Sequence, residues 1–399
     1  MSIQQHRSQN GAVSIFIVIL TALLVTIISV SFIRIMIQTQ QQAATADLSQ
    51  SAHDSALAGV EDAKRLLVTY QKDCTQTVPP AERCATLERL LRVDIPCDTI
   101  QQAGVEGNPG DKEVIIKRGE GDKALDQAYT CVKVMLETND YIGSVNRGAS
   151  RLVPLKGTGN FNEVVLEWYS QVDLQNANNN PGERRVALND ASSGLALPKL
   201  KDWPTNTPSL MRAQLIQFGS TFKLSDFDKL DDGSSNAHTL FLYPLSTGRD
   251  SVDFAEDLRL SQSSDVLQPV TCDPNFSTST SDSNYACKVV LKLPNAVGAT
   301  DTSRTAYLRL DPIYNNLTHF SVNLQNNGQL VKFKDVQPIV DSTGRANDLF
   351  RRVQSRVELE NDVFPYPESA VDLTGNLCKT FLVTDKPDDF SPGLCNPLP

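Results

Sequence analysis

The chain has 399 residues and a formal net charge of −10, with 40% hydrophobic and 21% charged residues. These averages exclude a polytopic membrane protein, a collagen-like chain and a disordered chain, and they allow one large domain or a few smaller ones. The charges are unevenly distributed, because residues 1–46 contain no acidic residue and only Arg7 and Arg34 as basic residues. Residues 38–399 therefore contain 35 basic and 47 acidic residues, which gives this part a net charge of −12.

An unbroken apolar run extends from Ala12 to Ile33 and contains no charge, glycine or proline. As a helix rising about 1.5 Å per residue, this run is long enough to cross a hydrocarbon core of roughly 30 Å. We therefore predict a transmembrane helix over residues 12–37. The run exceeds the roughly 7–15 residues of a cleaved signal-peptide core, so cleavage at Ala44–Ala46 is the less favoured alternative.

Helical periodicity continues beyond the apolar run, over residues 38–72. No proline precedes Pro79, and Gly59 weakens the helix by only about 1 kcal/mol. We predict a single helix of about 60 residues, roughly 90 Å long, whose outer part has small residues that let another helix or a sheet approach closely. Its apolar residues recur every three or four positions, on one face: Leu48, Ala52, Ala56, Val60, Ala63, Leu67 and Tyr70.

Residues 4–16, QQHRSQNGAVSIF, join a short polar leader with one arginine to a glycine and the start of the apolar helix. This resembles the leader of type IV pilins and pseudopilins, in which a membrane peptidase cuts after the glycine on the cytoplasmic side. The Ala-rich segment ending in A-G-x-E-x-A at 58–63 is similar to that of PilX-like minor pilins. The resemblance covers about residues 5–72. It implies a leader of 1–11, cleavage between Gly11 and Ala12, and a helix that packs in a filament.

Phe16 departs from the pattern of this family. It stands at the fifth mature position, where most major pilins have a glutamate that is thought to compensate the N-terminal charge of a neighbouring subunit. An unpaired charge inside an apolar filament core is costly. A filament made only of this chain is therefore disfavoured, and the resemblance implies a low-copy subunit with a tip or priming role.

From Val78 onwards, short apolar runs alternate with Gly, Pro, Asn, Asp and Ser, as is typical of strands and turns. We predict an α+β fold: the long N-terminal transmembrane and stalk helix, then a mainly antiparallel β extracellular body with a short helix at 85–92. Three prolines near residue 200 predict a linker at 198–208 between head units of 73–197 and 209–399. The predicted strands are Glu113–Lys117, Tyr129–Leu136, Glu163–Val172, Met211–Phe218, Thr239–Tyr243, Lys288–Leu293, Thr305–Leu310, His319–Leu324, Val353–Leu359 and Lys379–Val383.

All eight cysteines lie beyond residue 73, which favours an oxidising compartment for the body. Zinc ligation is disfavoured, because the chain contains no C-x-x-C and its four histidines are scattered. Short loops close most readily, so we predict disulfides between nearest neighbours. These pairs are Cys74–Cys84, Cys97–Cys131, Cys272–Cys287 and Cys378–Cys395.

The sequence offers no strong catalytic motif, since G-x-S-x-G, H-E-x-x-H and the P-loop are all missing. Cys272 has His238 upstream and Arg304 downstream, in faint similarity to a sortase, but the even number of cysteines favours a paired Cys272. The acidic turn at 225–234 is a weak calcium candidate, although a solvated turn is the preferred interpretation; its carboxylates are Asp226, Asp228, Asp231 and Asp232. We therefore predict no enzymatic activity, catalytic residue, cofactor or metal.

These observations predict a minor pilin-like subunit of a type IV pilus or related filament, with adhesion as a further candidate role. The expected partners are other pilin subunits, the inner-membrane assembly machinery, the prepilin peptidase and membrane lipid. Nucleic acid is not expected, because an acidic body repels phosphate. The expected location is a single-pass membrane protein with an extracytoplasmic body, at the pilus or cell surface. The alternative is a signal-anchored surface protein whose β body binds a ligand or hydrolyses a polymer.

Overall fold

The chain divides into two compact units, which are described separately: residues 1–135 with 339–357, and residues 136–338 with 358–399. The predicted linker at 198–208 lies within the second unit, so the predicted head units 73–197 and 209–399 do not match this division. The prolines of this segment do not mark a boundary, because Trp203 between them is buried against other aromatic rings. The computed structural model describes residues 10–74, 80–92, 97–116, 126–177, 185–188, 195, 197–219, 237–254, 267–276, 284–298, 304–315 and 317–359.

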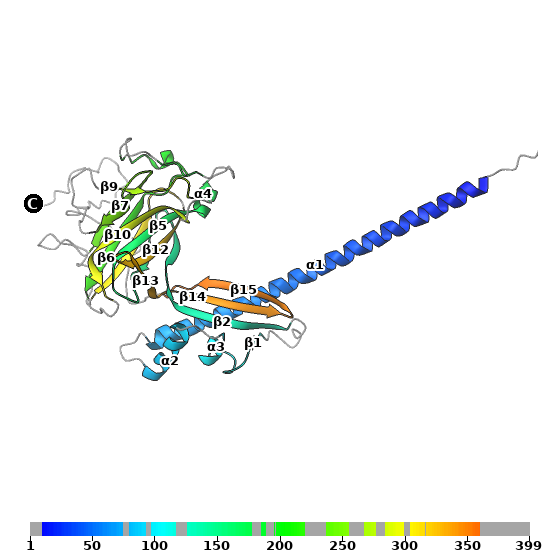
Figure 1. Ribbon diagram of the computed structural model, residues 1–399, viewed down its shortest axis with the longest axis horizontal. Coiled ribbons are helices and arrows are strands. Elements are labelled where there is room, and N and C mark those ends of the chain that lie inside the picture. The colour runs from blue at the N-terminus through cyan, green and yellow to red at the C-terminus, as the bar shows by residue number, and fades with distance from the viewer. Residues whose placement is uncertain are drawn as a thin grey trace, which may run out of the picture. The chain divides into compact units, whose positions relative to one another are not determined.

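Helix α1 (Asn10–Cys74) is 65 residues long and agrees closely with the predicted helix. Residues 15–47 are exposed on every face of the helix, whereas one face is buried from Ser51 onwards. Figure 1 shows the first part of α1 extending away from the sheet on which its second part packs. This buried face confirms the predicted apolar stripe, except that Leu48 at its start is only half-buried. The residues of this face, each at most 3% exposed, are Ala52, Ala56, Val60, Ala63, Leu66, Leu67 and Tyr70.

The second half of α1 packs on a four-stranded sheet of order β1–β2–β14–β15. Two glycines permit the close approach. A Cβ atom on Gly344 would overlap the backbone of Ala52 and Ala56, and one on Gly59 would lie 2.8 Å from a methyl group of Val132. The strands are β1 (Val114–Ile115), β2 (Gln127–Thr138), β14 (Phe333–Ala346) and β15 (Leu349–Arg356).

Polar and covalent links add to the packing of α1 in the first unit. The Tyr129 hydroxyl of β2 donates a 2.8 Å hydrogen bond to Asp62, whose carboxylate is buried on α1. The disulfide Cys74–Cys84 joins the end of α1 to α2 (Ala81–Arg92), and Cys97–Cys131 joins the segment before α3 (Thr99–Gln102) to β2. The predicted short helix at 85–92 lies within α2.

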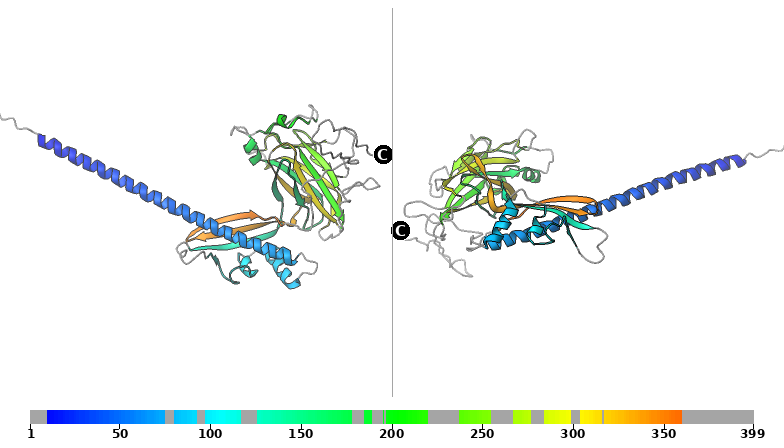
Figure 2. Two further views of the ribbon diagram at one scale, coloured as in Figure 1. Left: turned by 180° about the vertical axis from the view of Figure 1, so that it is seen from behind. Right: turned by 60° about the horizontal axis from the view of Figure 1, so that its bottom comes forward.

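The second unit contains two sheets that enclose one hydrophobic core (Figure 2). The six-stranded sheet has the order β13–β12–β5–β10–β8 with β3 also paired to β12, and the five-stranded sheet has the order β4–β11–β6–β7–β9. The strands are β3 (Tyr141–Asn146), β4 (Arg151–Pro154), β5 (Phe161–Ser170), β6 (Met211–Gly219), β7 (Ala237–Leu245), β8 (Ser251–Asp253), β9 (Leu267–Thr271), β10 (Tyr285–Val297), β11 (Arg304–Pro312), β12 (Leu317–Asn326) and β13 (Gln329–Val331).

Alternation of inward and outward residues builds this core, as expected for half-buried strands. Leu308 and Leu310 of β11 and Phe320 and Val322 of β12 are fully buried in one cluster, although their strands belong to different sheets. The disulfide between Cys272, just after β9, and Cys287 of β10 also joins the two sheets.

The predicted α+β class with a mainly antiparallel body is confirmed, because nine described strand pairs are antiparallel, whereas β8–β10 and β7–β9 are parallel. Every strand predicted before residue 359 overlaps an observed strand, and the strand predicted at Lys379–Val383 lies outside the described residues. The 14-residue strand β14 was not predicted.

Candidate functional site

The first candidate site is the exposed half of α1 in the first unit. Its apolar side chains have no cover in the described structure, and Phe16 is 74% exposed. From Ile15 the helix is long and apolar enough to cross a membrane, judged by length and composition. Gly11 and Ala12, the predicted cleavage residues, lie in the first turn of α1. An exposed apolar surface of this size is typical of a segment that contacts lipid or another apolar surface.

The predicted disulfides are present wherever the structure describes both cysteines. The pairs Cys74–Cys84, Cys97–Cys131 and Cys272–Cys287 are bonded, and Cys272 is therefore not a free thiol. Among the described residues, no cluster of three or more His, Cys, Asp or Glu side chains is suited to hold a metal ion. Cys378 and Cys395 and the calcium candidates Asp226, Asp228, Asp231 and Asp232 lie outside the described residues.

The second candidate site lies in the second unit, around helix α4 (Gln171–Ala177), which follows directly on β5. Ser170 and Asp173 form a reciprocal capping arrangement at its start. The Ser170 amide donates to the Asp173 carboxylate at 2.7 Å, and the Asp173 amide approaches the Ser170 hydroxyl at 3.5 Å. Such an S-x-x-D pair satisfies backbone donors that the first turn leaves free, and it fixes where the helix begins.

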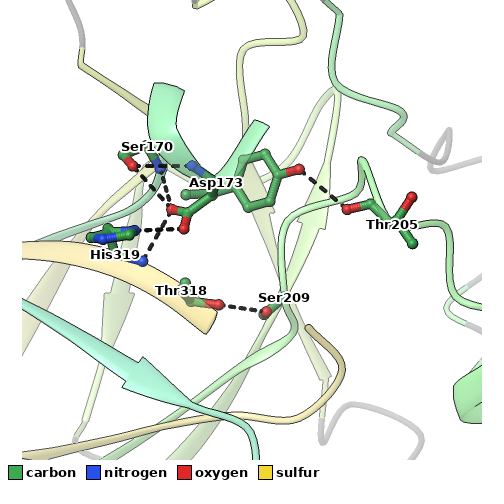
Figure 3. Close-up of polar contacts among 7 residues, drawn as sticks. Ser170, Asp173, Thr205, Ser209, Thr318 and His319 are labelled. Carbon is green, nitrogen blue, oxygen red and sulfur yellow. Dashed lines mark hydrogen bonds and ion pairs between the residues drawn. The ribbon is translucent and has the colours of Figure 1, made fainter. Parts of the chain in front are cut away.

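Asp173 also holds His319 of β12 (Figure 3). The Asp173 carboxylate lies 2.6 Å from His319 Nδ1 and accepts the His319 backbone N–H at 3.0 Å, while its side chain is only 2% exposed. A carboxylate at Nδ1 orients the imidazole and leaves Nε2 for another partner. The Ser170 hydroxyl binds the carboxylate at 3.1 Å and not the imidazole, so these three residues do not form the serine–histidine–carboxylate order of a hydrolase.

A groove of about 480 Å³ lies beside this pair. One wall is aromatic: Trp203 and Tyr314 stack with ring centroids 3.9 Å apart, and Tyr243 contacts the edge of Trp203. Asp173, Arg147 and two asparagines supply the polar part of the lining. The full lining is Arg147, Tyr169, Asp173, Asn176, Ala177, Leu200, Trp203, Thr205, Tyr314, Asn315 and Leu317.

Tyr169 has an unusual backbone conformation at the edge of this groove. Its φ of 68° lies in the left-handed region, which costs an aromatic residue on the order of 1–3 kcal/mol. Its hydroxyl donates to the Thr205 carbonyl at 3.4 Å (Figure 3). Burial, with the Asp173 carboxylate nearby, raises the pKa of Tyr169 far above its ordinary value, so the phenol stays a neutral donor. Such strained positions are often found at ligand sites.

The groove residues were not identified from the sequence. The prolines of 198–208 predict a linker, yet Leu200, Trp203 and Thr205 form part of the groove lining. The S-x-x-D spacing of Ser170 and Asp173 is typical of a helix N-terminus. The predicted strand Glu163–Val172 extends past this point, whereas the structure begins helix α4 at Gln171. His319 and Asp173 are 146 positions apart, and no local pattern indicates that they meet.

Comparison of the chain with models of protein families, with curated proteins and with solved structures found no match.

Proposed function

We propose that this chain is a minor pilin-like subunit of a type IV pilus or related filament. This proposal rests mainly on the division of α1. Its second half is fixed to a sheet of the same unit, whereas its first half up to Ile37 presents mostly apolar side chains that nothing in the described structure covers. A helix divided in this way anchors its unit in lipid before assembly. It then contributes the same apolar surface to a filament of helices.

Two further features support this proposal. The polar leader ending in Gly11 resembles a prepilin leader, and the three disulfides suit a body outside the cytoplasm. Phe16 supports a low-copy position at the tip or in a priming complex, because this chain offers no carboxylate there to pair with a neighbour's N-terminal amine. On this proposal the partners are other pilin subunits, the assembly machinery, the prepilin peptidase and lipid.

The N-terminus of the mature protein tests the proposal. In cells that contain a prepilin peptidase, mass spectrometry should find a chain that begins at a methylated Ala12. The variant Gly11→Val should keep the leader, whereas the matched change Gln9→Ala should be processed normally. An intact Met1 in the unaltered protein would instead favour a signal-anchored surface protein with a ligand-binding body, and a start at Asp47 would indicate ordinary signal cleavage.

A further inference from the structure

The groove of the second unit has an exposed guanidinium in its lining. The Arg147 side chain is exposed and held in place by one bond, from Nη1 to the Tyr314 carbonyl at 3.1 Å. Its other guanidinium N–H groups have no partner within the described residues. Trp203 is only 6% exposed, and its indole N–H has no acceptor in the part of the chain that the structure describes. This nitrogen is itself buried, so a ligand in the groove would meet the Trp203 ring and not its N–H.

The acceptors of the groove are largely occupied by the protein itself. The Asp173 carboxylate already receives the Ser170 amide and hydroxyl as well as the His319 amide and ring. A cationic ligand would therefore find no free carboxylate at Asp173. An anionic group, by contrast, meets a fixed guanidinium whose geometry matches a carboxylate in a two-point contact.

The remaining lining suits the hydroxyl and C–H groups of a sugar. The side-chain amide of Asn176 can both donate to and accept from hydroxyls. Asn315 Nδ2 already donates to the Thr207 carbonyl at 2.7 Å, which holds the Asn315 side chain in place and leaves its oxygen to accept from a hydroxyl. Leu200 and Leu317, which are 50% and 37% exposed, offer apolar contacts to the C–H face of a ring. The volume of about 480 Å³ is within the roughly 300–1,000 Å³ of small-molecule sites.

The charge of the protein narrows the class of anion. The net charge of −10 opposes a multiply charged ligand such as a phosphate ester, while a single carboxylate is balanced by Arg147 alone. We propose that the groove binds a carboxylate-bearing sugar, with Arg147 at the carboxylate and Asn176 and Asn315 at hydroxyls. This goes beyond the proposed function, since the groove lies in the second unit and does not involve α1.

The two tryptophans of the chain provide a direct readout. The Trp203 ring lines the groove and its indole N–H has no acceptor among the described residues, whereas the Trp168 indole N–H donates to the Ser209 carbonyl at 3.0 Å away from the groove lining. In the full chain, purified in detergent and labelled with ¹⁵N-tryptophan, the variant Trp203→Phe assigns the two indole signals. Galacturonic acid, glucuronic acid and N-acetylneuraminic acid are the probes. Galactose is the matched neutral sugar, and acetate is the carboxylate without a sugar.

At least one of the three acids should shift the Trp203 signal at millimolar concentration and leave the Trp168 signal in place. Galactose and acetate should each bind about tenfold more weakly, since each lacks one half of the recognised structure. Arg147→Gln, which keeps a donor for the Tyr314 carbonyl, should weaken binding about tenfold. The control Lys201→Gln removes a nearby exposed charge outside the lining and should change nothing.

The proposal is overturned if none of the acids shifts the Trp203 signal, if galactose or acetate binds as well as the acids, or if Arg147→Gln binds with unchanged affinity. An unchanged Trp168 signal in the Arg147→Gln protein shows that the unit is folded. If that variant does not fold, Asn176→Ala replaces it. This variant should bind the acids severalfold more weakly, and an unchanged affinity would also overturn the proposal. Because binding does not require cleavage at Gly11, either proposal can fail while the other stands.

Discussion

At the scale of single residues, small side chains decide how α1 meets its sheet. Gly59 in the helix and Gly344 in β14 each lack the Cβ atom that would collide with the other element. From sequence alone, Gly59 is merely a weak helix former. The structure gives it a packing role, because any larger residue would press on Ser342 and Val132. Two backbones that approach this closely tolerate little added volume.

The variant Gly344→Ala should therefore loosen α1 from its sheet. The added methyl group would overlap the backbone of Ala52 and Ala56, which cannot move aside as a flexible side chain would. We expect a loss of roughly 1–3 kcal/mol in the free energy of unfolding, or more, measured by urea unfolding of the full chain in detergent. Gly159→Ala is the control, because its nearest new contact would be an ordinary 3.8 Å. Equal stability of the two variants would contradict this account.

At the scale of elements, an ion-pair cluster joins the residue before the two-residue strand β1 to strand β14 and to the residue before β2. Arg345 of β14 donates two hydrogen bonds of 2.7 Å to Glu113, just before β1, and another of 2.7 Å to Asp126, just before β2. The Arg345 side chain is only 13% exposed. The hydrogen bonds from Arg345 lower the pKa of Glu113 below its ordinary value. The folded protein therefore favours the ionised carboxylate.

This lowered pKa gives the cluster a pH dependence of known sign. Its stabilisation is fully present above the ordinary Glu pKa of 4.5 and is lost as the pH falls through the lowered folded value. Arg345→Met should cost about 1–2 kcal/mol at neutral pH, allowing for solvent screening of the partly exposed carboxylates. On acidification to about pH 3, urea unfolding should show a smaller loss for this variant than for the unaltered protein.

The exposed neighbour Lys112 supplies the control for that measurement. Lys112→Met removes a positive charge one residue from Glu113 without touching the cluster, so it should keep the full acid sensitivity. If Arg345→Met and the unaltered protein lost equal stability on acidification, the cluster would not be the source of this pH dependence.

The elements that could be predicted from the sequence are those with a strong local pattern. In α1, apolar residues recur every three or four positions, and in the body short apolar runs are separated by turn residues. Cysteines close together in the chain, such as Cys74 and Cys84, are a further local pattern. Strand β14 was missed because Pro338, Asp341, Ser342 and Gly344 resemble turn residues. Its pairing partners β2 and β15 decide its conformation, and β2 lies about 200 residues away in the chain. Long-range pairing of this kind leaves no local signal.

At the scale of the whole chain, an apolar first half of α1 with Arg34 as its one charge precedes an acidic remainder. The first acidic residue is Asp47, where the buried face of α1 is about to begin. The helix therefore has an apolar surface for lipid or other helices up to about Ile37. The acidic residues begin after it, in the part that faces water and the sheet. This order of properties is what the proposed pilin-like role requires of one chain.

The proposed low-copy role makes a prediction about Phe16. In a filament, an apolar phenylalanine leaves the N-terminal amine of the neighbouring subunit without a carboxylate partner, so the purified chain alone should not form filaments. With other pilin subunits present, Phe16→Glu should raise its proportion in isolated filaments severalfold, measured by quantitative mass spectrometry. Phe16→Leu, which keeps the position apolar, should leave that proportion unchanged. Filaments of the unaltered chain alone, or equal incorporation of both variants, would contradict the assignment of Phe16 as the residue that limits copy number.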